Sequence, residues 1–315
     1  MEYILLIVGF ALLIKGADFF VDGASSIARA LMVPSIVIGL TLVSLGTSAP
    51  EAAVSITAGL RGSSDISLGN VIGSNVFNLL AVIGCAALVR QIPLQKGILS
   101  RDIPVSILST GILLVMMLNG GISRMEGLCL LAGIVIYMIV LVVNALRNRT
   151  EENEEKPLPI PLSLFYVVIG AGAIILGGQL VVNNATVIAL HFGMSETLVG
   201  LTIVAIGTSL PELVTSVMAA KKGDSGIALG NAIGSCIFNT FFIVGISSSL
   251  TPIKVDMNLV ADIIILIGIN ALVFIFCWTK KQVSRLEGVI LVGLYIAYTA
   301  YIIMRSYSML PTFSF

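Results

Sequence analysis

The sequence carries very little charge for its length. Only 11% of its 315 residues are Asp, Glu, Lys or Arg, whereas 57% are hydrophobic. A soluble domain has about 25% charged residues, so most of this chain must face lipid. Lys and Arg number 17, as do Asp and Glu, and this balance gives no field that would attract a nucleic acid. The composition excludes a soluble enzyme, a secreted domain and a nucleic-acid-binding protein.

Histidine and cysteine are also scarce. His191 is the only histidine, so it cannot build a histidine-based metal site or an acid–base site alone. The four cysteines lie apart in apolar runs, which predicts buried thiols rather than a disulfide framework or a CxxC metal site. No recognisable nucleophile or metal-binding histidine accompanies Glu51 and Glu212, the two carboxylates that could form an acid/base pair. We therefore expect neither an enzyme nor a bound cofactor.

Long apolar runs take the place of these features. A bilayer core needs about 20 apolar residues per helix, and ten such runs predict an all-α polytopic membrane protein with ten transmembrane helices. A polar linker at 147–161 separates a first half, 1–146, from a second half, 162–307. The predicted spans are 3–28, 35–60, 66–89, 103–119, 125–146, 162–189, 196–219, 227–250, 259–278 and 286–305.

The Lys and Arg residues predict the orientation of these helices. Twelve lie in loops that join an odd-numbered helix to the next even-numbered one, and four lie on the opposite side. Positive residues favour the cytoplasmic side, so we expect both termini to be extracytoplasmic. The expected location is the cell (inner) membrane, with the lipid bilayer as surroundings and no protein partner implied.

The two halves of the chain repeat each other. Gly39–Asn78 aligns with Gly200–Asn239 without a gap, and more than half of the aligned positions are identical. The same offset aligns Arg124 with Arg285 near the end of each half. Five helices are an odd number, so the second half must begin on the side where the first half ends. This predicts two inverted five-helix repeats, an arrangement typical of secondary transporters with a site at the bilayer midplane.

Two carboxylates, Glu51 and Glu212, lie deep inside apolar spans at equivalent positions of the repeats. An intramembrane carboxylate is costly, and no Lys or Arg lies at comparable depth, which favours a cation or proton site over a buried ion pair. Pro50 should break its helix because it lacks an N–H group. Thr47 and Ser48 stand close to that break. Carboxylate, hydroxyl and carbonyl oxygens are the ligands that calcium prefers, and sodium also favours oxygen.

Polar pairs follow in the next helix of each half. Ser74 and Asn78 are four residues apart, as are Ser235 and Asn239, so each pair lies on one helix face. Polar groups at membrane depth that face the two glutamates predict ion ligation or support of the ligands.

Four aspartates are weaker candidates. Asp18 and Asp22 lie in the first predicted helix, and Asp102 and Asp262 open the fourth and ninth. Their places near the membrane edges favour solvated or helix-capping roles.

The paired motifs GTSAPE and GTSLPE, each followed by GN-x-IGS-x-x-FN, resemble the two alpha-repeats of the calcium/cation antiporter superfamily. Among its branches they look most like the prokaryotic sodium/calcium exchangers, and the resemblance covers all ten helices. It implies that helices 2, 3, 7 and 8 form a core around the ion sites while helices 1 and 6 slide across it. It also implies exchange of sodium for calcium by alternating access, with both ions as transported substrates.

The resemblance further implies a set of ion ligands. Calcium would be held by the two glutamates with two threonines, sodium by these groups with four serines and two backbone carbonyls, and two asparagines would line the centre. The implied set is Glu51, Glu212, Thr47, Thr208, Ser48, Ser209, Ser74, Ser235, Asn78 and Asn239, with the carbonyls of Ser44 and Ala205. Some members, including the potassium-dependent branch, have Asp where this chain has Asn239, which weighs against potassium co-transport. A proton/calcium exchanger remains the main alternative, followed by a cation channel and, more remotely, a membrane enzyme.

Overall fold

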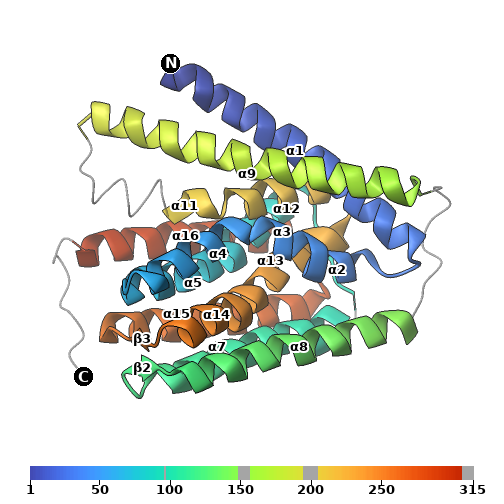
Figure 1. The fold of residues 1–315 in the computed structure, drawn as a ribbon. Coiled ribbons are helices and arrows are strands. Elements are labelled where there is room, and N and C mark those ends of the chain that lie inside the picture. The colour runs from blue at the N-terminus through green and yellow to red at the C-terminus, as the bar shows by residue number, and fades with distance from the viewer. Residues whose placement is uncertain (96, 148–156, 194–204, 307–315) are drawn as a thin grey trace.

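The chain is helical apart from four two-residue strands in the part that the computed structural model describes, residues 1–95, 97–147, 157–193 and 205–306 (Figure 1). The elements of the first half are α1 (Glu2–Ala30), α2 (Ser35–Ile38), η1 (Gly39–Val43), α3 (Ser44–Thr47), α4 (Ala49–Leu60), α5 (Ser64–Phe77), η2 (Asn78–Val82), α6 (Ile83–Val89), β1 (Ile92–Pro93), η3 (Ile98–Asp102), α7 (Ile103–Met117), β2 (Gly121–Ile122) and α8 (Arg124–Arg147). Those of the second half are α9 (Ile160–His191), α11 (Ala205–Thr208), α12 (Leu210–Lys222), α13 (Ser225–Phe238), η5 (Asn239–Ile243), α14 (Val244–Leu250), β3 (Ile253–Lys254), α15 (Met257–Lys280), β4 (Gln282–Val283) and α16 (Arg285–Ser306).

These helices correspond to the apolar runs predicted from the sequence. The described residues contain eight helices long and apolar enough to cross a membrane, or up to nine spans if the bent pair Ser35–Thr47 and Ala49–Leu60 is counted as one. The run predicted at 196–219 lies partly outside the described residues, and its described part consists of α11 and α12. The linker predicted at 147–161 lies mostly outside them as well. Ten spans therefore stay a prediction for the chain as a whole.

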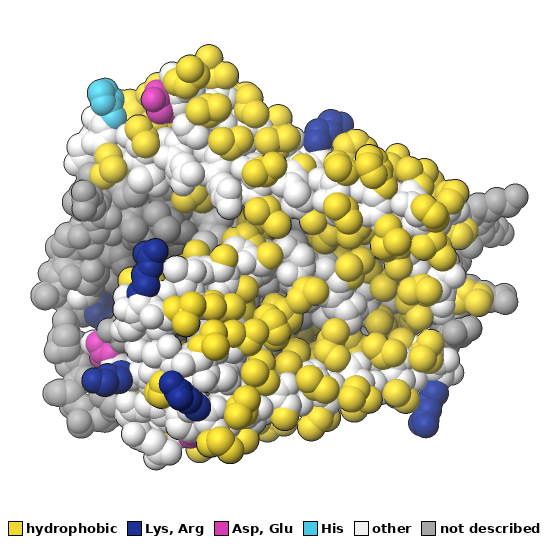
Figure 2. Space-filling model, in the orientation of Figure 1, with side chains coloured by type: hydrophobic (Ala, Val, Ile, Leu, Met, Phe, Trp, Pro, Cys, Tyr) yellow, Lys and Arg dark blue, Asp and Glu magenta, His cyan; other side chains and the backbone are white. Residues whose placement is uncertain are grey.

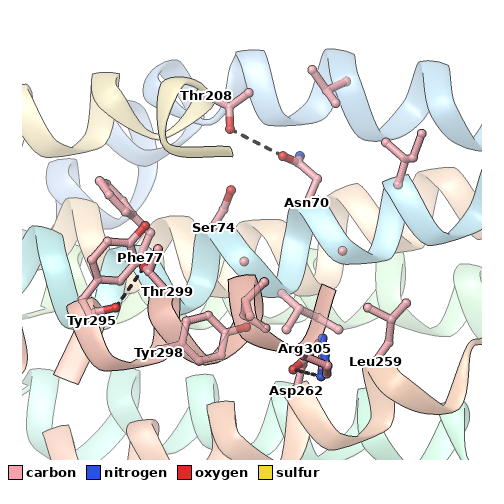
Figure 3. A pocket seen from close by; sticks show the side chains of 16 residues that line it. Asn70, Ser74, Phe77, Thr208, Leu259, Asp262, Tyr295, Tyr298, Thr299 and Arg305 are labelled. Carbon is pink, nitrogen blue, oxygen red and sulfur yellow. Dashed lines mark hydrogen bonds and ion pairs between the residues drawn. The ribbon is translucent and has the colours of Figure 1, made fainter. Parts of the chain in front are cut away.

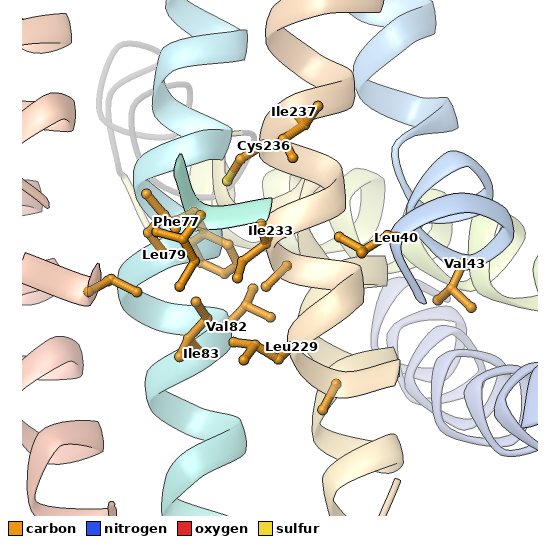
Figure 4. Close-up of a cluster of buried hydrophobic side chains, with 14 of the residues drawn as sticks. Leu40, Val43, Phe77, Leu79, Val82, Ile83, Leu229, Ile233, Cys236 and Ile237 are labelled. Carbon is orange, nitrogen blue, oxygen red and sulfur yellow. The ribbon is translucent and has the colours of Figure 1, made fainter. Parts of the chain in front are cut away.

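Two spans form the centre of the molecule. One is Ile66–Val89, in α5, η2 and α6, and the other is Ser225–Leu250, in α13, η5 and α14. Their most apolar stretches are 83% and 89% buried, whereas those of the other long helices are 17–39% buried. Figure 4 shows side chains such as Val82 and Ile233 packed between these two spans. Because these spans are buried on all sides, their polar residues, such as Ser74 and Asn239, are buried as well.

The helices α1 and α9 lie side by side across one face of this core (Figure 1). Glycines seven residues apart let them approach closely: a Cβ atom on Gly9, Gly16 or Gly23 would lie 2.6–3.0 Å from the nearest atoms of α9. Gly170 and Gly177 of α9 approach α1 equally closely. Small residues of this kind let helix backbones touch in membranes.

Apolar side chains cover the outside of the molecule. Val135 and Ile136 of α8 are 56% and 62% exposed, and Phe165 and Val168 of α9 are 57% and 67% exposed. Hydrophobic side chains spread over most of the face in Figure 2, with few charged groups among them. This surface suits the hydrocarbon of a bilayer, because a soluble protein rarely exposes apolar patches of such extent.

The short strands join loops from the two halves. β1 pairs with β4 through Ile92 and Val283, and β2 pairs with β3 through Ile122 and Ile253, both antiparallel. Each pairing thus fixes the end of a helix in one half against a loop of the other half.

Reciprocal capping begins two of the outer helices at equivalent positions. Before α8, the Ser123 N–H donates to Glu126 at 2.7 Å, and the Glu126 N–H donates back to the serine hydroxyl at 3.3 Å. Ser284 and Glu287 form the same pair of bonds at the start of α16. This capping box satisfies N–H groups that a helix start leaves without partners.

The structure corrects the expectation for Asp102 and Asp262. Neither is solvated: the two residues are 0% and 3% exposed. Asp102 accepts bonds from Arg101 at 2.6 Å and from the Tyr137 hydroxyl at 3.1 Å. Asp262 forms two bonds with Arg305, at 2.9 and 2.7 Å. Sequence position near a helix end did not reveal this burial, because neighbouring helices cover both sites.

The other two aspartates link α1 to the core. Asp18 and Asp22 are partly exposed, and each lies 2.6 Å from the Lys222 ammonium group at the end of α12. Both aspartates are thus partly solvated, as expected, and they also form ion pairs that connect α1 with α12, the helix that carries Glu212.

Candidate ion-binding site

The span that carries Glu51 is broken just before this residue. The segments before and after Ser48 differ in direction by 51°, as expected from the proline. Pro50 lies in the first turn of α4, where its missing N–H removes no helical hydrogen bond. The second half repeats this geometry, since Ser209 separates α11 from α12 and Pro211 opens α12.

The two glutamates behind these breaks are completely buried, each 0% exposed. The Ser209 hydroxyl donates to Glu51 Oε1 at 2.8 Å, and the Ser48 hydroxyl donates to Glu212 Oε1 at 2.9 Å. Each carboxylate is therefore bound by a serine from the other half of the chain. The second oxygen of each, Oε2, has no hydrogen-bond partner, and neither glutamate forms an ion pair with any described residue. A buried carboxylate oxygen without a donor is costly, and a bound cation would satisfy it.

Asn231 forms hydrogen bonds with the helix that carries Glu212. Its Nδ2 donates to the backbone carbonyl of Glu212 at 3.2 Å and to the Ser216 hydroxyl at 2.9 Å. Its Oδ1 accepts a bond from the Thr47 hydroxyl at 2.9 Å. Asn231 therefore joins the broken helix of the first half to the glutamate helix of the second.

Asn70 makes the equivalent contacts in the first half. Its Nδ2 donates to the backbone carbonyl of Glu51 at 3.4 Å and to the Ser55 hydroxyl at 2.9 Å, while its Oδ1 accepts a bond from Thr208 at 3.5 Å. Both asparagines belong to the GN motif of the repeats but are not among the ligands predicted from the sequence. Their recurrence at equivalent positions of the repeat was the signal that could have found them.

The predicted serines lie in the same hydrogen-bond network. Ser209 is 3.0 Å from the Ser74 hydroxyl as well as bonded to Glu51, and the Ser235 hydroxyl is 3.5 Å from Glu212 Oε1. The structure thus brings four predicted serines to the two carboxylates, with Ser48 as the fourth.

Asn78 and Asn239 follow one turn after these serines and are both 0% exposed. Each begins a π-helical turn, η2 or η5. Such turns often occur at functional sites, and no sequence pattern predicted them here. Neither amide atom of Asn78 has a hydrogen-bond partner, nor does Oδ1 of Asn239. Buried amide oxygens of this kind are available to a ligand.

The two implied carbonyl ligands are less clearly placed. The Ser44 carbonyl already accepts a bond from the Ser48 N–H at 3.0 Å and lies 3.4 Å from the Thr47 hydroxyl oxygen. Ala205 is the first residue of α11, and the N–H of Ser209 donates to Ile206 at 3.1 Å. The role of both carbonyls stays a prediction.

A cavity of about 420 Å³ reaches this network from one side. Asn70, Ser74 and Thr208 line it at one end, and the Asp262–Arg305 ion pair lines it at the other (Figure 3). Ser74 contacts Ser209, which in turn donates to Glu51, so two hydrogen bonds connect the cavity wall to the Glu51 carboxylate.

The ligand chemistry of this site is that of hard cations. The site offers two carboxylates, several hydroxyls and two amide oxygens. Among the described residues there is no cluster of three or more His, Cys, Asp or Glu side chains of the kind that holds a transition metal. Oxygen ligands without thiolate or imidazole favour sodium or calcium over zinc or copper.

Comparison with known proteins agrees with this chemistry. The sequence pattern of the sodium/calcium exchanger protein family matches residues 1–143 and 162–304. The chain belongs to this family. The resemblance drawn from the GTS-x-PE motifs is thereby confirmed, and the chain is a multi-pass membrane antiporter rather than an enzyme.

Relatives in this family are similar over nearly their whole length. The inner membrane protein YrbG of Escherichia coli is 36% identical over 308 residues, covering 94% of this chain and 95% of YrbG. The sodium/calcium exchanger MaX1 of Methanosarcina acetivorans is 34% identical over 339 residues, covering 94% and 97%. A solved structure of the sodium–calcium exchanger NCX_Mj, soaked with zero Na+ and Ca2+, superposes with a TM-score of 0.85 at 32% identity, covering 96% of this chain and 98% of that one.

Proposed function

We propose that this antiporter exchanges sodium for calcium by alternating access, with Glu51 and Glu212 as the paired ion-binding carboxylates. One observation carries the proposal: both carboxylates are buried, each is held by a serine of the opposite half, and each keeps one oxygen without a partner. Two ionised carboxylates carry a charge of −2, which one calcium ion neutralises.

Competition for the same oxygens would couple the two ions. Calcium would bind Glu51 and Glu212 with the hydroxyls of Thr47 and Thr208. Sodium ions would use these groups together with further oxygens, so the two loads exclude each other. The further sodium ligands are Ser48, Ser209, Ser74 and Ser235, with the carbonyls of Ser44 and Ala205, while Asn78 and Asn239 line the centre. An empty, charged site should resist crossing the membrane, whereas a neutralised site can cross.

We also propose that the halves 1–146 and 162–307 are inverted repeats joined by a cytoplasmic linker at 147–161. The strand pairing supports this. β1 and β2 lie at opposite ends of α7, and their sequence equivalents in the second half are β3 and β4. β3 pairs with β2, and β4 pairs with β1, so equivalent loops lie at opposite ends of the molecule. The charge bias of the loops puts both termini outside the cytoplasm, and the expected location is the cell membrane.

The stoichiometry follows from the family resemblance. Three sodium ions in exchange for one calcium ion would move one net charge per cycle, worth about 2.3 kcal/mol per 100 mV. An inward sodium gradient would then expel calcium from the cytoplasm.

Calcium-45 uptake into proteoliposomes tests the proposal. Vesicles are loaded with sodium, potassium or choline, each with and without a pH gradient. We expect uptake only with internal sodium, and loss of uptake in Glu51→Gln and Glu212→Gln. Glu126→Gln is the matched control, because Glu126 only caps α8 and glutamine also serves in a capping box.

Other outcomes separate the alternatives. Uptake driven by the pH gradient regardless of sodium would replace the proposal with proton/calcium exchange. Ion fluxes far above carrier turnover would indicate a channel. Absence of uptake under every gradient, in protein shown to be folded, would mean that calcium is not the substrate.

A further inference from the structure

Asn75 lies in the core beside the proposed ligand Asn239 and is 1% exposed. Its Nδ2 is 3.0 Å from the Thr240 hydroxyl oxygen and 3.4 Å from the backbone carbonyl of Cys236. Its Oδ1 accepts a bond of 3.1 Å from Nδ2 of Asn239. Asn75 is on α5 and the other three residues are on α13 and η5, so this network joins the two central spans.

The single proton of the Thr240 hydroxyl determines which atoms of Asn75 and Asn239 donate and which accept. The Thr240 hydroxyl donates its only proton to the Cys236 carbonyl at 3.0 Å, so toward Asn75 it can act only as an acceptor. Asn75 must therefore present Nδ2 to Thr240 and Oδ1 to Asn239. Asn239 must in turn present Nδ2 to Asn75, which turns its own Oδ1 away. That oxygen is buried and has no hydrogen-bond partner.

We propose that Asn75 is a positioning residue, which holds the Asn239 amide in the one orientation that offers its oxygen to the transported cation. This inference rests on the proposed function. A cation binds an amide oxygen and is repelled by an amide NH2 group, so a flipped Asn239 would weaken binding. Fixing the amide before the ion arrives removes that cost of ordering.

The two halves of the site differ in this respect. The sequence equivalent of Asn75 is Cys236, whose thiol donates to the Asn75 backbone carbonyl at 3.7 Å and lies among hydrophobic side chains (Figure 4). A thiol is only a weak hydrogen-bonding group, and both amide atoms of Asn78 are unpartnered. Asn239 is thus preset as an oxygen ligand, whereas Asn78 can rotate to follow the bound ion.

The same network favours a neutral amide at position 239. An ionised carboxylate there would direct an oxygen at Asn75 Oδ1, and Asn75 could not turn without breaking its bonds to Thr240 and Cys236. The chain therefore combines Asn239 with Asn75 and leaves only two carboxylates at the site.

Sodium-driven calcium-45 uptake tests the positioning role. The half-saturating calcium concentration and the maximal rate are measured for wild type, Asn75→Ala, Asn239→Ala and the double variant. We expect Asn75→Ala to raise the half-saturating concentration about fivefold, the equivalent of one hydrogen bond, with a smaller change in maximal rate. Because Asn75 acts through Asn239, the double variant should bind calcium no more weakly than Asn239→Ala alone.

Val76→Ala is the matched control, since Val76 is the next residue of α5 and is also buried. It should lower thermal stability and leave the half-saturating concentration unchanged. If Asn75→Ala does not fold, Asn75→Cys takes its place, because the other half already has a buried cysteine at that position. Additive effects in the double variant, an unchanged half-saturating concentration, or an equal rise in Val76→Ala would overturn the inference. A wild-type protein without sodium-driven uptake would instead overturn the proposed function.

Discussion

The contact between α1 and α9 depends on glycines whose replacement should force the helices apart. A Cβ atom on Gly170 would lie 2.6 Å from the Phe20 nitrogen and 2.7 Å from the Gly16 oxygen. Both are backbone atoms and cannot rotate away. An ordinary contact of about 3.5 Å would require the two helices to separate by roughly 1 Å along this seam.

The expected cost of Gly170→Ala follows from two opposing effects. Overpacking of a tight interface costs about 1–3 kcal/mol, while replacing glycine in a helix returns up to about 1 kcal/mol. The net loss should be about 1–2 kcal/mol. Each kcal/mol lowers the unfolding temperature by roughly 2–4 °C in a protein of 150–250 residues, and by less in a longer chain such as this one of 315 residues.

Gly172→Ala is a control on the same helix, because a Cβ atom there meets nothing within 4 Å. Its stability should be unchanged or slightly higher. Both variants are purified in one detergent, and their unfolding is followed by intrinsic fluorescence at one scan rate, since the apparent midpoint depends on that rate. A Gly170→Ala protein as stable as Gly172→Ala would refute the backbone contact between α1 and α9.

Three further variants test other contacts. Ser209→Ala removes a charge-assisted bond to the Glu51 carboxylate, worth about 1.5–3 kcal/mol, so calcium should bind at least roughly tenfold more weakly in uptake assays; a change below twofold would contradict this role. Asp262→Asn leaves the partly buried Arg305 without its carboxylate partner and should cost about 1.5–3 kcal/mol of stability; an unfolding temperature equal to that of wild type would show that the pair is not needed. Lys222→Gln removes partly exposed ion pairs, worth about 0–1 kcal/mol, so stability should hardly change. Its exchange should be faster if movement of α1 must break these pairs, and an unchanged or slower rate would count against such movement.

The spans could be predicted from the sequence because lipid imposes a simple rule on length and polarity. The repeated motifs also indicated the broken helices, since Pro50 and Pro211 cannot continue a hydrogen-bonded helix. Glu51 and Glu212 could be selected as candidate ligands because an unpaired carboxylate is rarely buried in a membrane without a role. These inferences depend on local properties of the chain.

The contacts between the halves could not be predicted in the same way. Equivalent motifs do not reveal whether Ser48 binds its own glutamate or the one in the other repeat, because both possibilities preserve the symmetry of the sequence. Asn75 carries no repeat signal, since its equivalent is Cys236. The burial of Asp262 depends on which helices cover a span end, and that is a property of packing.

The exchange of serines between the halves restricts how the site can move. Ser48 reaches the glutamate of the second half, and Ser209 reaches that of the first. A rotation of one broken helix against the other would break both bonds at once and remove the shortest hydroxyl bond of each buried carboxylate, a cost of about 1.5–3 kcal/mol for each. The four helical segments around the carboxylates should therefore stay together during transport. α1 and α9 contact each other through their backbones, and the polar contacts of α1 with α12 and the start of α13 include the partly exposed ion pairs of Lys222 and the Ser25–Asp224 hydrogen bond. Under the proposed alternating access, moving α1 and α9 together would therefore leave the bonds to both carboxylates intact.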